Sequence, residues 1–543
     1  MQRLRELGLT NADFTFPQIM SRQAQRNGDR CYLLFEQSRW SYGEADRLTD
    51  RIANGLLDSG IRPGDHIVVM MGNGPEIIWV TYALGKIGAV SCPLNTAARG
   101  DLLAYFFTQS DAVAAIVGEA SWSRFASVAH RVPSLRTVIR VPEQTDEIAK
   151  VTLPSTIQCI PYESVAQGAD RSPGILVQPN DPQGIFFTSG TTGPSKGVLT
   201  TNAQSFAWSV GRVEFLGYQP QDVLYTCLPL FHLNALNSAA IAALVGDSQL
   251  ALSRRFSASR FWNEVRETKA TQFNLLGSMV NMLWAQPISP LDGVHTVRQC
   301  GTVPVPIFAP DFEKRFRVKF VTSYAITDAG QGTFLQPGYP QDKFRSTGKP
   351  RPGVEIEIRD ENDQVLPARS SGEICMRSAD PALAPRTYYK MPEANTKATR
   401  NGWFHTGDRG YFDDDGYLWF VDRDKDAIRR RGENVSSWEV EQIIGSHPAV
   451  LDVAVFPVSS EMQEDEVMAC VSLKEGQSLD PAALIHFCND RMAYYMVPRY
   501  VEFLPELPRN MSEKVHKREL RASAESRLIE VWDRERAGIH LSR

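Results

Sequence analysis

The stretch on which the fold prediction depends most is Asp181–Val198, DPQGIFFTSGTTGPSKGV. Within it, Gly184–Phe187 is short and apolar, which predicts a buried strand. The ten residues Thr188–Gly197 that follow contain three glycines, five hydroxyl side chains, one proline and one lysine. Glycines let backbone N–H groups approach an anion closely, hydroxyl groups add donors, and Lys196 adds a positive charge. The composition fits a polar surface loop or a polyphosphate cradle, and the order of the residues favours the cradle.

This loop differs from the common nucleotide-binding pattern, in which a lysine stands between a glycine and a serine or threonine. Here Ser195 precedes Lys196 and Gly197 follows it. The prediction is therefore a phosphate-binding loop of another kind.

Composition and charge are those of an ordinary globular protein. The chain has 543 residues, with 43% hydrophobic and 22% charged residues, which is ordinary for a globular protein of several folding units. Its formal net charge is -5, and its densest basic run is the short Arg429–Arg431. Charge therefore gives no reason to expect a nucleic-acid partner.

The cysteines and the apolar segments indicate the cellular compartment in which the protein is expected. The eight cysteines form no C-x-x-C pair, so neither a zinc site nor a disulfide framework is expected. The first residues, MQRLRELGLTNADF, lack the apolar centre of a signal peptide, and no stretch reaches the length of a membrane span. We expect a cytoplasmic protein with reduced thiols and no transmembrane segment.

Alternating patterns predict an α/β fold with largely parallel sheets. Predicted strands are Cys31–Phe35, His66–Met71, Ala89–Leu94 and Ala112–Val117, and predicted helices are Pro17–Asn27, Ala45–Gly60 and Pro75–Gly88. A second group of segments near the carboxy terminus predicts a small α+β unit: Leu451–Val458, Glu466–Leu473, Pro481–Met492 and Tyr500–Phe503. The expected architecture is a large amino-terminal domain of mixed and parallel sheets with helices, plus a small mobile α+β lid.

The run Thr188–Gly197 resembles the signature loop of the adenylate-forming superfamily, which includes acyl- and aryl-CoA ligases, firefly luciferase and peptide-synthetase adenylation domains. Members make an acyl-AMP from a carboxylic acid and ATP, and usually pass the acyl group to a thiol. The resemblance implies that this loop holds the β- and γ-phosphates of ATP. It assigns this role to Thr188, Ser189, Gly190, Thr191, Thr192, Gly193 and Lys196.

Two further segments resemble the parts of this family that bind the acid and adenine. Leu228–Asn234 resembles the loop that borders the carboxylate pocket, so His232 and Leu233 are expected in its wall, with His232 as gate and not as general base. An ionised carboxylate is already a nucleophile and needs no proton removed. Gly301, Thr302 and Val303 resemble the segment whose backbone packs against adenine, a weaker match, because glycine before a loop is common.

Val321–Asp328 resembles the motif Tyr-Gly-x-Thr-Glu of the family. The resemblance implies that Tyr324 flanks adenine, Thr327 binds the α-phosphate and Asp328 holds Mg²⁺. Asp328 is one methylene shorter than the usual glutamate, but Mg²⁺ accepts either acid. Ala325 replaces the usual glycine at the wall of the acyl pocket, so its methyl group is expected to narrow that pocket and favour a compact acid.

The later motifs imply a ribose site, a hinge and a second catalytic surface. Asp408, in the segment Trp403–Asp408, is expected to accept hydrogen bonds from the ribose hydroxyls, although a turn aspartate after glycine is an alternative. Asp422–Ile428 resembles the hinge, with Arg423 reaching ribose or phosphate and Lys425 at the pivot. Gly432 is expected against the pantetheine arm of CoA.

Pro508–Val515 resembles the terminal loop that carries the catalytic lysine of the family, here Lys514. Glu513 stands where the family usually has glycine, which puts a negative charge beside the lysine and weakens this assignment.

These resemblances predict the following division: large ATP- and acid-binding domain 1–422, hinge 423–425, lid 426–520 and a polar tail 521–543. The segment Arg430–Ser436 most resembles the carnitine/crotonobetaine-type acyl-CoA ligases. The implied activity is acid–thiol ligation with ATP and CoA as co-substrates and Mg²⁺ as cofactor. Transfer to a carrier protein or an amine, or a regulator that has lost catalysis, are left as alternatives. The acid and the oligomeric state, including a homodimer, are left open.

Overall fold

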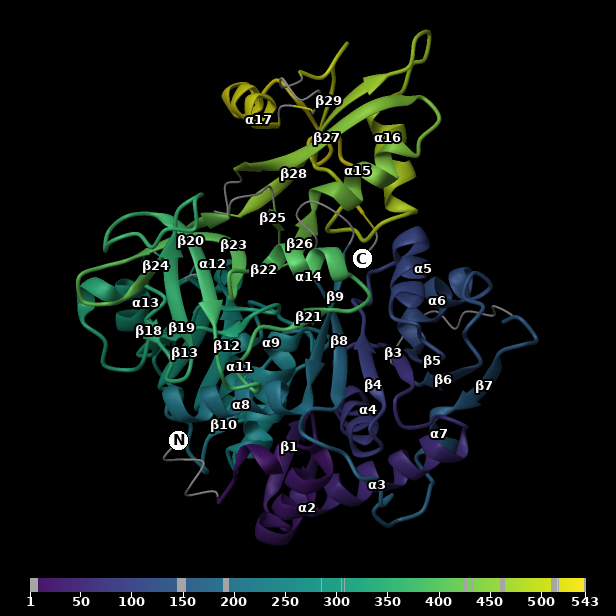
Figure 1. Ribbon diagram of the computed structural model, residues 1–543, viewed down its shortest axis with the longest axis vertical. Helices are drawn as coiled ribbons and strands as arrows, with labels where there is room; N and C mark the ends of the chain where they lie inside the picture. Colours follow the sequence, from purple (N-terminus) through teal and green to yellow (C-terminus); the bar gives the residue numbers. More distant parts are fainter. Residues whose placement is uncertain are drawn as a thin grey trace.

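The computed structural model describes residues 8–143, 153–188, 195–284, 286–303, 305–306, 308–423, 427–430, 433–459, 464–508, 515 and 517–541. These residues form a large body of sheets and helices, with a smaller carboxy-terminal domain at one end, close to α5 (Figure 1). This confirms the predicted α/β class and the small α+β unit. Among the described residues, no helix combines the length and the apolar character that crossing a membrane requires.

The first sheet of the body has the strand order β21-β9-β8-β4-β3-β5-β6-β7. Its strands are β3 (His66–Met70), β4 (Val90–Pro93), β5 (Ala114–Gly118), β6 (Thr137–Val141), β7 (Gln158–Pro161), β8 (Pro182–Thr188), β9 (Lys196–Thr201) and β21 (Thr387–Tyr388). β4 and β8 pair in parallel, whereas β8 and β9 are antiparallel and place Thr188 opposite Lys196. Lys196 and Gly197 therefore begin a strand, which corrects the prediction that the loop continues to Gly197.

The second sheet has the order β14-β13-β12-β10-β11-β1-β2. Its strands are β1 (Cys31–Phe35), β2 (Ser38–Ser41), β10 (Val223–Thr226), β11 (Gln249–Leu252), β12 (Gln272–Leu276), β13 (Gln299–Val303) and β14 (Lys319–Val321). All neighbours except β1 and β2 are parallel. The carboxyl ends of β10, β12, β13 and β14 therefore lie at one edge, where ligands of such sheets usually bind.

Helices bury the faces of these two sheets. Those of the body are η1 (Asn11–Asp13), α2 (Phe16–Asn27), α3 (Tyr42–Asp58), α4 (Pro75–Lys86), α5 (Gly100–Gln109), η2 (Glu119–Ser121), α6 (Trp122–Ala129), α7 (Tyr162–Val165), α8 (Asn202–Phe215), α9 (Leu233–Ala235), η3 (Leu236–Ile241), α10 (Ala242–Val245), α11 (Phe261–Glu267), α12 (Gly277–Trp284), α13 (Ala309–Phe316), η4 (Gln341–Lys343) and α14 (Pro392–Ala398). The main apolar core includes Phe16, Tyr82 and Phe206, from α2, α4 and α8. α3 begins at a capping box of Ser41 and Glu44, as the sequence predicts.

A third sheet carries the last strands of the body. It consists of β19 (Glu355–Arg359), β20 (Gly372–Arg377), β22 (Thr399–Arg400), β23 (Trp403–Phe412) and β24 (Leu418–Arg423). Two short pairs lie between the second and third sheets in the chain: β15 (Ala325–Ile326) with β16 (Gly330–Gln331), and β17 (Thr333–Phe334) with β18 (Lys349–Pro350).

The small domain follows a hairpin of β25 (Ala427–Arg430) and β26 (Glu433–Ser436). Its other elements are α15 (Ser437–Gly445), β27 (Val450–Ser459), β28 (Asp465–Leu473), α16 (Pro481–Asn489), β29 (Tyr500–Phe503), α17 (Lys517–Ser526) and β30 (Trp532–Asp533). β30 pairs with β29, and buried Asp533 forms an ion pair with Arg499 at 3.1 Å. Residues 521–541 thus pack onto the lid sheet and do not form a separate polar tail.

Candidate active site

Two residues predicted to contact adenosine lie together in the structure. The Tyr324 hydroxyl donates a hydrogen bond to Asp408 Oδ2 at 2.8 Å, and both side chains are buried. Tyr324 follows β14, whereas Asp408 lies on β23, where it is paired in register with Arg423 of β24. The second and third sheets therefore meet where the ring and ribose sites were predicted.

Thr327 and Asp328 lie beside a tyrosine and an arginine that the sequence analysis did not assign. The Tyr388 hydroxyl donates to Asp328 Oδ2 at 2.6 Å, and Arg386 Nη1 donates to the Thr327 carbonyl at 2.9 Å. Burial, together with the nearby Asp328 carboxylate, raises the pKa of Tyr388 above its usual value, so this tyrosine remains a neutral donor. Nothing in the run Arg386–Tyr389 marks these residues, because the contacts depend on strands far apart in the chain.

Tyr388 also connects this corner to the phosphate loop. The Lys196 ammonium lies 4.2 Å from the centroid of the Tyr388 ring. Asp328 Oδ1 accepts no hydrogen bond from the described part of the chain, so it could serve as an oxygen ligand of the kind that Mg²⁺ prefers. The oxygen at Asp328 thus fits the implied metal, and Tyr388 contacts both Asp328 and Lys196.

The acid-side loop contacts the small domain. His232 Nε2 lies 3.0 Å from Glu433 Oε2, on the hairpin that leads into that domain. Burial alone would lower the pKa of His232, but the Glu433 carboxylate outweighs it and raises the pKa above the ordinary value. Leu233 is buried, and Ala325 is half-buried and paired with Gln331. His232 is therefore positioned as one side of a contact between the domains.

The small domain also contacts the end of the phosphate loop. Glu439 Oε1, on α15, accepts hydrogen bonds from the backbone N–H of Ser195, at 2.8 Å, and from its hydroxyl group. Burial raises the pKa of Glu439 to about 7, although the two hydrogen bonds from Ser195 act in the opposite direction. A carboxyl group that titrates near neutral pH therefore joins the lid to the phosphate loop.

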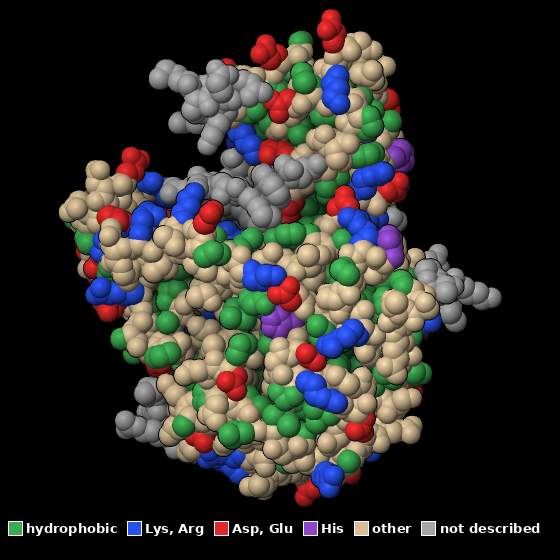
Figure 2. All heavy atoms as spheres, turned by 45° about the vertical axis from the view of Figure 1, so that its right-hand side comes forward, with side chains coloured by type: hydrophobic (Ala, Val, Ile, Leu, Met, Phe, Trp, Pro, Cys, Tyr) green, Lys and Arg blue, Asp and Glu red, His purple; other side chains and the backbone are tan. Residues whose placement is uncertain are grey.

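Further contacts hold the two domains in this arrangement. Tyr495 accepts a hydrogen bond from Asn95 at 3.1 Å, the Asn489 carbonyl accepts one from Arg99 at 2.6 Å, and Arg429 reaches the Val303 carbonyl at 3.3 Å. Figure 2 shows the small domain seated on the body, with acidic and basic side chains interspersed over the face that it presents. The described residues of that face show no large area of one sign.

The adenine segment lies at the end of β13. Thr302 is buried, and the Val303 carbonyl faces Arg429. A Cβ atom at Gly301 would lie 2.4 Å from Asn274 Oδ1, so a larger residue there would force the Asn274 side chain on β12 to move.

Several predicted site residues lie outside the described residues. These are Ser189, Gly190, Thr191, Thr192, Gly193, Lys425, Gly432 and Lys514. Arg423 is placed only by its backbone, at the end of β24. Thr188 is half-buried at the end of β8, where the phosphate loop begins.

A separate group of metal-ligand type lies on β23, the strand of Asp408, and on the neighbouring β20. Glu373, Cys375 and His405 place one ligand atom each within 4.8 Å of one another. His405 Nδ1 lies 2.8 Å from Glu373 Oε2 and 3.4 Å from Cys375 Sγ. Burial raises the pKa of Cys375 to about 12, so the thiol is neutral, and Arg400 already contacts Glu373 at 3.3 Å. We interpret this group as a hydrogen-bonded support for β23.

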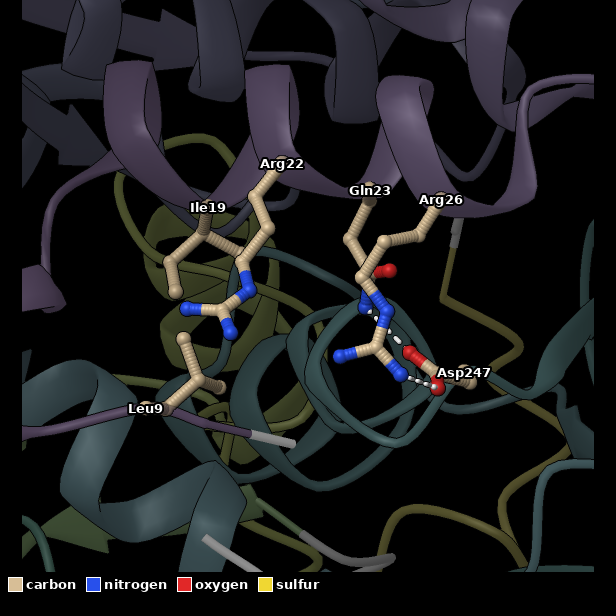
Figure 3. A pocket seen from close by; sticks show the side chains of 6 residues that line it. All are labelled: Leu9, Ile19, Arg22, Gln23, Arg26 and Asp247. Carbon is tan, nitrogen blue, oxygen red and sulfur yellow. Dashed lines mark hydrogen bonds and ion pairs between the residues drawn. The ribbon is translucent and has the colours of Figure 1, made fainter. Parts of the chain in front are cut away.

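A small pocket at the amino-terminal side is unrelated to these loops. Figure 3 shows Gln23 and Arg26 of α2 pointing toward Asp247, whereas the Arg22 side chain extends beside Leu9. Gln23 donates to Asp247 at 2.7 Å, and Arg26 lies 3.6 Å from the same carboxylate. These mutual contacts identify it as part of the packing of α2.

The titration of Glu439 predicts that docking of the small domain weakens as the pH rises. Docking raises the Glu439 pKa from 4.5 to about 7, so the docked state binds more protons than the undocked state between these values. Docking should therefore be strongest below about pH 4.5 and weaken by up to about tenfold per pH unit until pH 7. Energy transfer between a dye on the small domain and one on the body, measured at pH 6 and pH 8, tests this expectation.

Glu439→Gln should remove most of that pH dependence, because the amide stays neutral. Glu441→Gln is the matched control, since Glu441 lies on the same helix but pairs with Lys517 within the small domain, at 2.6 Å. Equal pH profiles for the wild type and Glu439→Gln would contradict the assignment.

Comparison with known proteins identifies the family. Residues 20–388 match the AMP-binding enzyme family and residues 439–514 match the AMP-binding enzyme C-terminal domain. A crotonobetaine/carnitine–CoA ligase of Salmonella heidelberg is 31% identical over 516 residues, which cover 91% of this chain and 96% of that protein.

Solved structures show the same fold. A double mutant of o-succinylbenzoate CoA synthetase from Bacillus subtilis, bound with its product analogue, superposes with a TM-score of 0.80 at 24% identity, over 94% of this chain and 98% of that one. The same enzyme in complex with its acyl-adenylate intermediate gives 0.66, also at 24% identity and over the same shares of the two chains. The first of these two forms is thus the nearer match in overall geometry. The chain therefore belongs to the AMP-binding enzyme family, the adenylate-forming superfamily that its loop sequences resemble.

Proposed function

We propose that this enzyme is an AMP-forming acyl-CoA ligase, which activates a carboxylic acid with ATP and transfers the acyl group to CoA. The observation that carries the proposal is that the segment Tyr324–Asp328 contacts two other sheets of the body. Tyr324 donates to Asp408 of the third sheet, and Asp328 accepts from Tyr388 of the first sheet, whose ring lies beneath the Lys196 ammonium. The likeness to crotonobetaine/carnitine–CoA ligases over most of the chain supports the same activity.

In the first step, a carboxylate oxygen of the acid attacks the α-phosphorus of ATP, and the bond to pyrophosphate breaks. No proton is transferred, so catalysis consists of positioning and charge stabilisation. Thr188 and Lys196 would hold the departing phosphates, Thr327 the α-phosphate and Asp408 the ribose. Asp328 would hold Mg²⁺, which when bound offsets phosphate charge. Lys514 is assigned the charge that develops on the reacting oxygens.

In the second step, the CoA thiol loses its proton to solvent, and its sulfur attacks the acyl carbonyl as AMP leaves. The proposal assigns the hinge to 423–425, with Lys425 as pivot, and places Gly432 against the pantetheine arm. Rotation about this hinge would withdraw Lys514 and present Gly432. The contact between His232 and Glu433 supports a docked arrangement in which the hairpin of β25 and β26 lies beside the acid-side loop.

Pyrophosphate release with a panel of acids tests the proposal. The panel should include short, branched and dicarboxylic acids, a long-chain fatty acid and carnitine, each with and without CoA in the presence of Mg²⁺. We expect release that depends on one class of acid, and an acyl-CoA product only when CoA is present. Because Ala325 adds a methyl group at the acyl side, compact acids should react better than long-chain ones. A product formed with amines but not with CoA would favour the amide-forming alternative, and no release with any acid would contradict the activity.

A further inference from the structure

The acid side of the site has an unusual neighbour, a group of buried arginines. Arg212 on α8, Arg351 after β18 and Arg386 before β21 are 5%, 8% and 5% exposed. Within the described residues, none of the three forms an ion pair with a carboxylate. Asp380 and Asp328 act on Arg351 and Arg386 only through space. Burying guanidinium groups without a partner anion is costly, so the arrangement calls for an explanation.

Two of these arginines meet at one side chain. With its amide turned so that both polar atoms are satisfied, Gln331 accepts hydrogen bonds from Trp208 Nε1 at 3.1 Å and from Arg212 Nε at 3.2 Å. In the opposite orientation of the amide, Gln331 Oε1 accepts from Arg351 Nη1 at 3.4 Å, so this side chain cannot accept from both arginines at once. Neither Arg351 Nε nor Arg386 Nε, both buried, has a hydrogen-bond acceptor in the described part of the chain. The group therefore has more donors than acceptors.

This group borders the residues assigned to the acyl pocket. Gln331 is paired across β15 and β16 with Ala325, whose methyl group is at the acyl wall. Arg212 also reaches Asn234, at 3.5 Å, and Asn234 directly follows Leu233 in the acid-side loop. Arg386, the third arginine of the group, donates a hydrogen bond to the Thr327 carbonyl. The arginines thus border residues that are predicted to line the acyl pocket.

Burial also makes the charged form of the three guanidinium groups less favourable. It lowers the pKa of Arg351 and of Arg386 to about 10 and lowers that of Arg212 as well. Each group nevertheless stays charged at neutral pH. An anion brought among them would relieve this cost, because a guanidinium donates paired hydrogen bonds to a carboxylate.

We propose that Arg212 and Arg351, on either side of Gln331, recognise an anionic group at the far end of the acid, so that the substrates are acids with a second carboxylate. This inference rests on the proposed ligase function and names its substrate class. One carboxylate of such an acid would react at the α-phosphorus, and the other would accept hydrogen bonds from the arginines. An acid with an apolar or trimethylammonium tail would leave the arginines unpaired.

Matched pairs of acids provide the test. Pyrophosphate release is measured for pairs of a monoacid and a diacid of similar size: butanoate and succinate, pentanoate and glutarate, hexanoate and adipate, and benzoate and terephthalate. An acid with a trimethylammonium tail tests the effect of a positive charge in place of the second carboxylate. For at least one pair we expect kcat/KM to favour the diacid by about 10- to 100-fold, the size of a charged hydrogen-bond pair. The monoacid and the trimethylammonium acid should be poor. Equal or better turnover of monoacids throughout would overturn the inference and leave the ligase function standing, whereas no release with any acid would remove the function itself.

Two substitutions separate recognition from folding. Arg212→Met should remove the preference for the diacid, and Arg212→Lys should retain part of it. Because Arg212→Met removes a buried charge without a partner anion, the melting temperature of the ligand-free enzyme should stay the same or rise. Arg315→Met is the matched control, since the Arg315 side chain on α13 is 13% exposed but is paired with Asp292 at 2.7 Å.

The control should lower the melting temperature and keep the preference for diacids, the reverse of Arg212→Met. Addition of the preferred diacid should also raise the melting temperature of the wild type more than that of Arg212→Met, a readout that needs no turnover. The inference is wrong if Arg212→Met keeps the preference for diacids, or loses it only because the protein no longer folds. Arg351→Met in the same assay should give the same result as Arg212→Met.

Discussion

Lys514→Ala is expected to slow acyl-adenylate formation by about 10²–10³-fold, the usual effect of removing one preorganised charge stabiliser. Transfer of the acyl group from supplied acyl-adenylate to CoA should stay close to the wild-type rate, because that step needs no charge at the departing pyrophosphate. Single-turnover assays of the two half-reactions measure both rates. Glu513, beside Lys514, makes this test informative, since a neighbouring carboxylate could reduce the effect of the lysine.

Gly432→Leu provides the opposite case. A side chain at this position would intrude where the pantetheine arm is proposed to pass, so transfer to CoA should fall and adenylate formation should remain. Equal damage to both steps by both substitutions would argue against two arrangements of one lid and favour a rigid site. An unchanged adenylation rate in Lys514→Ala would place the catalytic cation elsewhere.

Local patterns were sufficient for much of the fold. Cys31–Phe35 and Tyr500–Phe503 are strands with the predicted bounds, and the capping box at Ser41 starts α3. Such elements are encoded by neighbours in the sequence: apolar runs between turns, or a serine three residues before a glutamate. The alternation of these elements likewise sufficed to predict the parallel sheets.

Contacts between distant segments were not predictable in this way. Lys196 looks like part of a polar loop, but its pairing with Thr188 makes it the first residue of β9. Residues 521–543 look like a polar tail, and only the partners Arg499 and β29 make Asp533 part of a sheet. Both cases depend on pairing partners that the local composition does not reveal.

The same reason explains which site residues were missed. Tyr324 and Asp408 were assigned from their motifs, and the structure shows them bonded to each other. Tyr388 and Glu439 lie in segments without a distinctive pattern, and their roles arise only where β21 reaches Asp328 and α15 reaches Ser195. Interactions across domains therefore account for most of what the sequence could not predict.

Asp408→Ala is expected to lower kcat/KM for ATP by at least about 10²-fold, because a buried carboxylate that accepts two ribose hydroxyl hydrogen bonds contributes roughly 1.5–3 kcal/mol for each. Asp408 is only 3% exposed, so water cannot replace the lost acceptor easily. The substitution should also remove the advantage of ATP over 2′,3′-dideoxy-ATP, since both nucleotides would then lack a partner for the ribose edge. Steady-state kinetics with the two nucleotides, for the wild type and the variant, form a cycle that isolates this contact.

Tyr324→Phe separates the effect of the Asp408 carboxylate on the ribose from the effect of its hydrogen bond to Tyr324. It removes the 2.8 Å hydrogen bond to Asp408 and keeps the ring that is proposed to flank adenine. The ribose contact should survive, so kcat/KM for ATP should fall by less than about tenfold, the effect of one neutral donor, and the preference for ATP over the dideoxy nucleotide should persist. If Tyr324→Phe abolished that preference as completely as Asp408→Ala, the carboxylate would act mainly by holding the tyrosine, and the ribose contact would have to be reassigned. If neither variant changed the preference, the third sheet would not reach the ribose at all, and the meeting of Tyr324 with Asp408 would be a matter of packing alone.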